Sequence, residues 1–150
     1  MDSQSTERTA GYRLLDHVTD AFIESWGPTL EQAYAQSGRA LFDTMLNIDK
    51  VQPGTTDTIR ATGHDEKELL YNWLEQLLLK FEVDSMVYSK FEVSPINRGE
   101  TSLSLMAKAK GELFDPRKHE PKIEVKGVTY HLMEIDVTPQ EARVRFLLDL

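Results

Sequence analysis

Residues 65–81 read DEKELLYNWLEQLLLKF and contain the most hydrophobic stripe of the chain. Asp65, followed three residues later by Glu68, is typical of the capping box that begins a helix. The apolar residues after it recur every three or four positions, as on one face of a helix; they are Leu69, Leu70, Trp73, Leu74, Leu77, Leu78 and Phe81. Each such side chain contributes roughly 1.5 to 3 kcal/mol when fully buried. We therefore expect this helix to form the centre of the core.

A second amphipathic helix is predicted earlier in the chain. Thr29 is its expected N-cap, and apolar residues follow at helical spacing as far as Met45. Seven other segments have strand character; they span residues 11–15, 21–26, 55–62, 85–93, 101–113, 123–137 and 144–150. Residues 55–62 are polar and are expected to form an edge strand. Asn97-Arg98-Gly99 predicts a turn and residues 114–121 a charged loop. The expected fold class is α+β, a mixed or antiparallel β-sheet sandwich of about six or seven strands with two amphipathic helices packed on it.

The composition limits the class of protein. With 150 residues, 40% of them hydrophobic, the chain is one domain long. We expect residues 11–150 to form that domain and the polar residues 1–10 to be a disordered leader. The absence of cysteine excludes disulfides, zinc–thiolate sites and thiol nucleophiles. No signal-like segment and no run of about 18 apolar residues occurs, which favours an intracellular protein.

The sequence offers little support for a familiar enzyme. Phosphate-binding loops, dinucleotide-binding glycine motifs, the nucleophile elbow of hydrolases and the metalloprotease histidine motif do not occur. The histidines at positions 17, 64, 119 and 131 are scattered, and we interpret each as a solvated or hydrogen-bonding side chain. The formal net charge of −8 disfavours broad contact with nucleic acid phosphates.

Two segments far apart in the sequence are candidates for a joint site. Asp20 ends the polar run Asp16-His17-Val18-Thr19-Asp20 between two predicted strands, and Asp149 and Leu150 end an apolar strand at the C-terminus. If folding brings Asp20, Asp149 and the terminal carboxylate of Leu150 together, their charges would either raise the pKa of one group sharply or recruit a divalent cation, and the cation costs less. Oxygen ligands without cysteine favour Ca²⁺, Mg²⁺ or Mn²⁺. The alternative is that Asp20 caps a turn while Asp149 is solvated.

Several segments resemble the archease family. Residues 12–20 (YRLLDHVTD), 26–33 (WGPTLEQA) and 40–45 (ALFDTM) are similar to its opening, which has a His-Thr-Ala-Asp-like element and a Thr-Leu-Glu-Glu-Ala helix start. Gly111-Glu112, a basic loop ending in His119, residues 125–131 (VKGVTYH) and a final Asp plus one aliphatic residue continue the resemblance. This chain departs from the family pattern at Val18-Thr19, where Thr-Ala is typical, and at Gly127, where Ala is usual.

The resemblance implies a non-catalytic cofactor of the RtcB-type RNA ligase, which promotes guanylylation and multiple turnover of that ligase in tRNA splicing. It implies Asp20, Asp149 and Leu150 as metal ligands, with Ca²⁺ as the first candidate and Mg²⁺ or Mn²⁺ as alternatives, and Asp20, Lys126 and Asp149 as ligase-activating residues. The expected partner is the ligase, within a complex that a DEAD-box helicase could join, and RNA contact would be indirect or weak. The expected location is the cytoplasm, with the nucleus left open.

Two other classes remain open on the sequence alone. A metal-dependent enzyme acting on RNA or phosphoesters could use the same carboxylates, and a chaperone-like scaffold would need neither of them. A run of basic residues is a further candidate surface for ligase or RNA, although a solvated face is favoured for all of them except Lys126; the run comprises Lys108, Lys110, Arg117, Lys118, Lys122 and Lys126.

Overall fold

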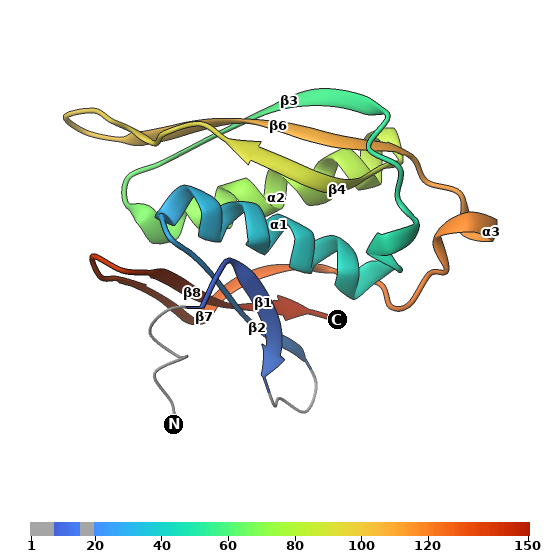
Figure 1. Cartoon of the computed structure of the whole chain (residues 1–150), viewed down its shortest axis with the longest axis horizontal. Coiled ribbons are helices and arrows are strands. Elements are labelled where there is room, and N and C mark those ends of the chain that lie inside the picture. Colours follow the sequence, from blue (N-terminus) through green and yellow to red (C-terminus); the bar gives the residue numbers. More distant parts are fainter. Residues whose placement is uncertain (1–7, 16–19) are drawn as a thin grey trace.

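The computed structural model describes residues 8–15 and 20–150, and Figure 1 shows three layers, with two long helices between two antiparallel sheets. The strands are β1 (Gly11–Leu15), β2 (Asp20–Gly27), β3 (Thr55–Gly63), β4 (Met86–Val93), β5 (Asn97–Arg98), β6 (Leu103–Leu113), β7 (Gly127–Val137) and β8 (Ala142–Asp149). The helices are α1 (Leu30–Met45), α2 (Glu66–Asp84), the short α3 (Pro116–His119) and the 3-10 turn η2 (Ile48–Lys50).

The first sheet has the strand order β1-β2-β8-β7, and the second has β3-β6-β4 with β5 paired to β6. All strand pairs of the described chain are antiparallel. The expected α+β class is therefore confirmed. The C-terminal strand β8 lies inside the first sheet, between β2 and β7, so the end of the chain is held on both sides.

Three local predictions differ from the structure. The described chain has eight strands rather than about seven, because Asn97–Arg98, expected as a turn, pairs with β6. The expected loop at 114–121 contains α3, which begins because the side chain of Asp115 accepts a hydrogen bond from the Arg117 N–H ahead of a proline at the first turn. The strand expected from residue 123 begins only at Gly127.

Helix α2 is the centre of the core, as its sequence predicts. Its N-cap Asp65 accepts a hydrogen bond from the Glu68 N–H, and its six central apolar side chains are buried. Trp73 is fully buried, its Nε1 donates to the Tyr34 carbonyl at 2.9 Å, and its ring meets Phe91 edge-on. Phe81, at the end of the stripe, is only partly buried.

Helix α1 packs against both sheets, which its predicted amphipathic pattern did not indicate. It contacts β2 of the first sheet and β4 of the second. Ala33 and Ser37 face β2, where the Ser25 hydroxyl is hydrogen-bonded to both of them. Gly38 instead leaves room for Leu77 of α2 and Phe91 of β4. Thr29 is the N-cap, as expected, and accepts from the Gln32 N–H. No helix in the described ranges is long and apolar enough to cross a membrane.

Replacing Trp73 with alanine is expected to lower the free energy of unfolding by about 3 to 5 kcal/mol, because it leaves a large cavity between the two sheets. Urea denaturation followed by circular dichroism measures this loss. Leu79→Ala, on the exposed side of the same helix, is the control and should change little. Equal effects of the two substitutions would contradict the central place of Trp73.

Candidate functional site

Antiparallel pairing of β2 with β8 places Asp20 directly opposite Asp149. Their neighbours Ala21 and Leu148 are buried, so both aspartates lie on the outer face of the first sheet. Side chains opposite each other on one face have Cβ atoms about 4.5 to 5.5 Å apart. The two acids predicted to converge therefore do so, at the end of the sheet where β2 begins and β8 ends.

We call the end of the sheet that carries Asp20, Asp149 and Leu150 the corner, and Lys126 also belongs to it. Its backbone N–H donates to the carbonyl of Asp149 at 2.7 Å, and Gly127 faces Asp149 from β7. Asp149 is thus flanked by Asp20 on one side and by the start of β7 on the other. Leu150 follows directly, partly buried against the core. Asp16 and His17 of the predicted polar run lie outside the described residues.

A pocket of about 470 Å³ opens beside this corner, between the β1–β2 hairpin and the last turns of α1. Asp20 and Leu150 line one side of it, and Asp43 lines another. Asp43 is already engaged, because it accepts from the Tyr12 hydroxyl at 3.0 Å and from Lys122 Nζ at 3.3 Å. Burial and the nearby Asp43 carboxylate raise the pKa of Tyr12 to about 12, so this hydroxyl keeps its proton at neutral pH.

The paired aspartates fit a hard cation in donor type but do not form a complete cage alone. Two like charges facing each other across strands destabilise a sheet unless something neutralises them. Carboxylate oxygens are ligands that Ca²⁺ and Mg²⁺ accept. Among the residues that the structure describes, no three His, Asp or Glu side chains are arranged to hold a metal ion. A cation here would need the chain terminus, water or a partner's oxygens as further ligands.

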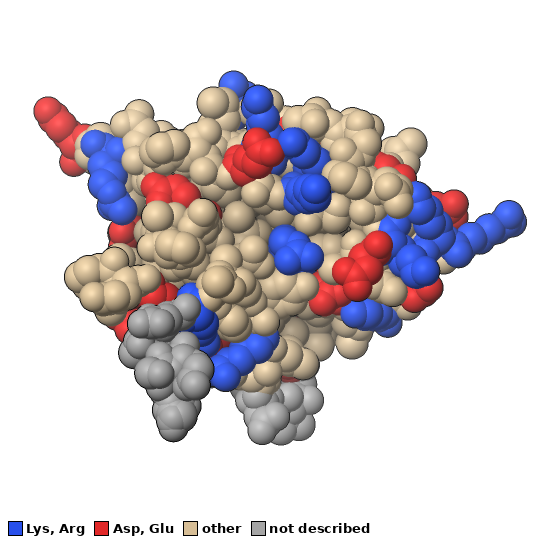
Figure 2. Space-filling model, in the orientation of Figure 1, with Lys and Arg blue, Asp and Glu red and all other residues tan. Residues whose placement is uncertain are grey.

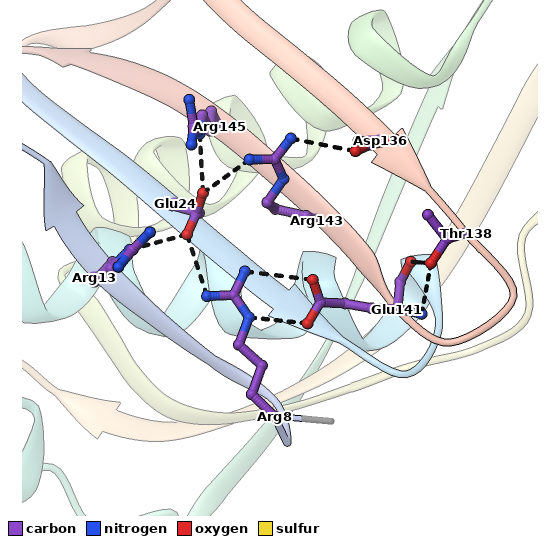
Figure 3. A network of polar contacts seen from close by, with 8 residues as sticks. All are labelled: Arg8, Arg13, Glu24, Asp136, Thr138, Glu141, Arg143 and Arg145. Atoms are coloured by element: carbon purple, nitrogen blue, oxygen red, sulfur yellow. Dashed lines mark hydrogen bonds and ion pairs between the residues drawn. The ribbon is translucent and has the colours of Figure 1, made fainter. Parts of the chain in front are cut away.

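The strands that carry Asp20 and Asp149 are joined further along by a buried carboxylate. Glu24 is fully buried, and Figure 3 shows arginines from three segments pointing at it. Arg13 Nε and Arg145 Nε each donate to it at 2.9 Å, Arg143 at 3.3 Å and Arg8 at 3.4 Å. Burial alone would raise the pKa of Glu24, but the Arg145 hydrogen bond and the charges of Arg13 and Arg8 outweigh it and lower the pKa.

Arg8 belongs to the stretch expected to be a disordered leader. It contacts Glu24 and Glu141, and its guanidinium lies 3.8 Å from the centre of the Trp26 ring. Residues 1–7 of that stretch lie outside the described residues. The charge network was not foreseen, although the alternation of Arg143 and Arg145 with apolar residues, and Glu24 within an apolar run, were visible in the sequence.

A second buried polar contact holds the loop between β6 and β7. His119 is fully buried, and its Nδ1 accepts from the Asp115 N–H at 2.9 Å, so Nε2 carries the proton and donates to Glu112 at 2.7 Å. Burial would raise the pKa of Glu112. The hydrogen bonds donated by the Gln52 N–H, Lys118 and His119 outweigh burial and lower the pKa to about 2. His119 therefore has a hydrogen-bonding role, as interpreted from the sequence.

The predicted basic run is not one continuous surface. Lys110 pairs with Glu92, Lys118 with Glu112 and Lys122 with Asp43. Figure 2 shows lysines and arginines mixed with acids over the visible face. Since each of these lysines faces a carboxylate, this arrangement lacks the unbroken positive surface that phosphate backbones require.

The fold and the corner define the class of protein. It is a two-sheet α+β protein in which the pairing of β2 with the last strand, β8, brings two aspartates together. A sequence profile of the archease protein family matches residues 12–150. The archease of Pyrococcus abyssi is 42% identical over 124 residues, covering 83% of this chain and 87% of that protein. The archease of Sulfurisphaera tokodaii is 35% identical and covers 93% and 98%. The chain therefore belongs to the archease family.

Solved structures agree with this assignment. The solution structure of protein 1598 from Methanobacterium thermoautotrophicum has a TM-score of 0.81 and 32% identity, covering 93% of this chain and 99% of that chain. A Thermotoga maritima crystal structure, described as an archease and possible chaperone, has a TM-score of 0.56 at 15% identity, covering 92% and 96%. At that identity the second structure supports the fold alone.

Replacing Glu24 with glutamine is expected to lower the free energy of unfolding at pH 7 by about 1 to 3 kcal/mol, because charged hydrogen bonds to arginines are lost. The folded-state pKa of Glu24 lies below its ordinary value of 4.5, so the carboxylate stabilises the fold above that pH and less as the pH falls through the folded pKa. The difference between wild type and Glu24→Gln should therefore shrink towards pH 3.

Urea denaturation at several pH values measures this difference. Glu134→Gln, an exposed glutamate opposite Arg145 on the same sheet face, is the matched control and should change stability little at any pH. A stability gap for Glu24→Gln that stays constant from pH 7 to pH 3 would contradict the electrostatic role.

Proposed function

We propose that this protein is a non-catalytic activator of an RtcB-type RNA ligase in tRNA splicing, which promotes guanylylation and multiple turnover of that ligase. The observation that carries the proposal is the Asp20–Asp149 pair at a chain end docked inside a sheet. Membership of the archease family is consistent with this role. An anionic corner fixed by two strands is a surface that another protein's active-site mouth can receive.

In this proposal the residues of the corner have separate tasks. Asp20, Asp149 and the terminal carboxylate of Leu150 hold a divalent cation, Ca²⁺ first and Mg²⁺ or Mn²⁺ as alternatives, which would supply positive charge beside the ligase's nucleotide. Lys126 starts from the same corner, because its N–H is bonded to the Asp149 carbonyl. Its ammonium is a mobile cation on a flexible stem and suits contact with a phosphate or a ligase carboxylate.

The other parts of the proposal follow from charge. With a net charge of −8 and paired lysines, the protein suits contact with a ligase better than direct contact with RNA. RNA contact would then be indirect, through a complex that a DEAD-box helicase could join. The proposal places the protein where tRNA splicing occurs, inside the cell, in the cytoplasm or the nucleus.

Multiple-turnover RNA ligation by the cognate ligase tests the role. Asp20→Ala, Lys126→Ala and a variant with extra residues after Leu150 should each reduce stimulation by about tenfold or more, because about 1.4 kcal/mol of lost interaction is a factor of ten. Circular dichroism and thermal unfolding should show that each variant keeps its fold. The extended variant acts by moving the terminal carboxylate away from Asp20.

Asp136→Asn is the matched control for that assay. Asp136 lies on the same sheet, opposite Arg143 at the far end of β7, and its substitution should leave stimulation unchanged. RNA turnover by the purified protein without ligase would instead indicate a metal-dependent enzyme. Stimulation that survives loss of both Asp20 and Asp149 would indicate a scaffold or chaperone-like role.

Cation binding is tested separately, without the ligase. Ca²⁺ at a hundredfold excess over its Kd should stabilise the protein by about 2.7 kcal/mol, visible as a rise in Tm. Asp20→Asn and Asp149→Asn should abolish the rise, whereas Asp136→Asn should keep it. Isothermal titration with Ca²⁺, Mg²⁺ and Mn²⁺ ranks the cations, and failure of all three to bind would contradict the cation part of the proposal.

A further inference from the structure

A second exposed feature lies on β7, the edge strand of the first sheet. Thr129 pairs with Leu147, but the next pair is Glu134 with Arg145, so β7 has four residues where β8 has one, Phe146. We call residues 130–133 the β7 bulge. Bulges commonly re-aim side chains or protect an edge strand from further pairing.

The β7 bulge holds a leucine in a strained conformation. Leu132 has φ 61°, in the left-handed region that leucine rarely adopts, at a cost on the order of 1 to 3 kcal/mol. The other described non-glycine residues with positive φ, Ser85 and Glu120, cap helix C-termini, where this conformation is common. Leu132 lies inside a strand, and 43% of it is exposed. The strain therefore displays an apolar side chain rather than burying it.

The surroundings keep the bulge in place. The His131 N–H donates to Thr129 Oγ1 at 3.1 Å, and Met133 is buried in the core. At the start of β7, the Val128 N–H donates to Glu75 of α2 at 3.3 Å. These contacts hold the chain on both sides of the β7 bulge, so the backbone that carries its exposed side chains has a defined conformation.

Tyr130 extends the same surface towards α2. Its ring stacks on Tyr71 with centroids 4.4 Å apart and an interplanar angle of 7°, yet Tyr130 is 49% exposed. Glu68 in the first turn of α2 is paired with the exposed His64 ring at 2.7 Å. Burial, followed by the charges of Glu68, Tyr71 and the N-cap Asp65, raises the pKa of Tyr130. An aromatic face beside carboxylates attracts lysine or arginine and repels phosphate.

We propose that the β7 bulge is a second contact of this protein with its ligase, which receives a basic residue over Tyr130 and an apolar residue beside Leu132. This inference rests on the proposed function, since it takes the ligase as the partner. It separates two tasks along one strand: the corner with Lys126 and Asp149 activates, and the β7 bulge contributes affinity. Tyr130 lies three residues after Gly127, which pairs with Asp149. Because Tyr130 turns towards α2 and Asp149 lies on the outer face, a partner would reach both around the β7 edge of the sheet.

Leu132→Gly is the sharpest test, because glycine adopts positive φ without strain. We expect the Tm of this variant to equal or exceed that of wild type. The concentration needed for half-maximal stimulation of the ligase should rise by about fivefold or more, as at an interface hot spot. Maximal stimulation at saturation should stay at the wild-type level. Met106→Ala, on β6 of the other sheet with 44% exposure, is the matched control and should change neither quantity.

Glu68→Gln tests the chemistry of the partner. A basic partner segment should bind more weakly to this variant, with a smaller salt dependence, whereas an RNA base stacked on Tyr130 should bind more tightly. Isothermal titration with the purified ligase and, separately, with a short single-stranded RNA decides between them. Tighter RNA binding would overturn the proposal in favour of a nucleic acid contact.

The two proposals can fail separately. Asp20→Asn should lower maximal stimulation and leave the half-maximal concentration unchanged, the reverse of Leu132→Gly. Wild-type affinity of Leu132→Gly for the ligase would overturn the bulge proposal and leave the activating corner intact. A fall in Tm of Leu132→Gly together with weaker binding would show a structural role and would also overturn it. Full stimulation by Asp20→Asn would instead overturn the proposed activating corner.

Discussion

The pairing of β2 with β8 is the constraint on which the other features depend. β8 is the last strand in the sequence but lies inside the first sheet, so its register is fixed by β2 on one side and β7 on the other. Because side chains alternate between faces, a slip by one residue would bring Asp149 into the core and expose Phe146. The same register therefore determines both the buried apolar face and the meeting of Asp20 with Asp149.

Electrostatics distinguish this register from its alternatives more sharply than apolar packing does. Glu24 lies opposite Arg13 in β1 and opposite Arg145 in β8, and both arginines donate to it. A shifted strand would bury Glu24 without these partners, and an uncompensated buried carboxylate costs several kcal/mol. An apolar residue at this position would pack against several registers. We therefore infer that Glu24 specifies the alignment that the anionic corner requires.

Sequence patterns predicted the features that depend on local periodicity. The stripe of α2, the cap at Thr29 and the alternation of the last strand each follow from one segment, and the structure agrees with them. The convergence of Asp20 with Asp149 was one of two alternatives left open by the sequence, and the register of β2 with β8 brings the two residues opposite each other. The divalent cation was inferred from the carboxylates and the ligase role from family resemblance, and both remain proposals.

What the sequence did not reveal depends on contacts between distant segments. The Glu24 network joins residues more than a hundred positions apart, and the β7 bulge is defined only by comparing two strands. The place of α1 between the sheets was hidden because its small buried residues, Ala33 and Gly38, resemble ordinary helix positions. Periodicity shows which face of a helix or strand is apolar, but it does not show how many neighbouring elements pack against that face.

The corner and the bulge illustrate how a rigid sheet can hold features that disfavour folding. Acids placed directly opposite each other on one face of a sheet disfavour strand pairing, and the strained Leu132 costs on the order of 1 to 3 kcal/mol. Both features lie in the sheet whose register is fixed by Glu24 and by the buried residues of β8. Neither Asp20 beside Asp149 nor Leu132 at positive φ contributes to the core. In the proposal above, the ligase that covers Leu132 gives this strained and exposed side chain a role in binding.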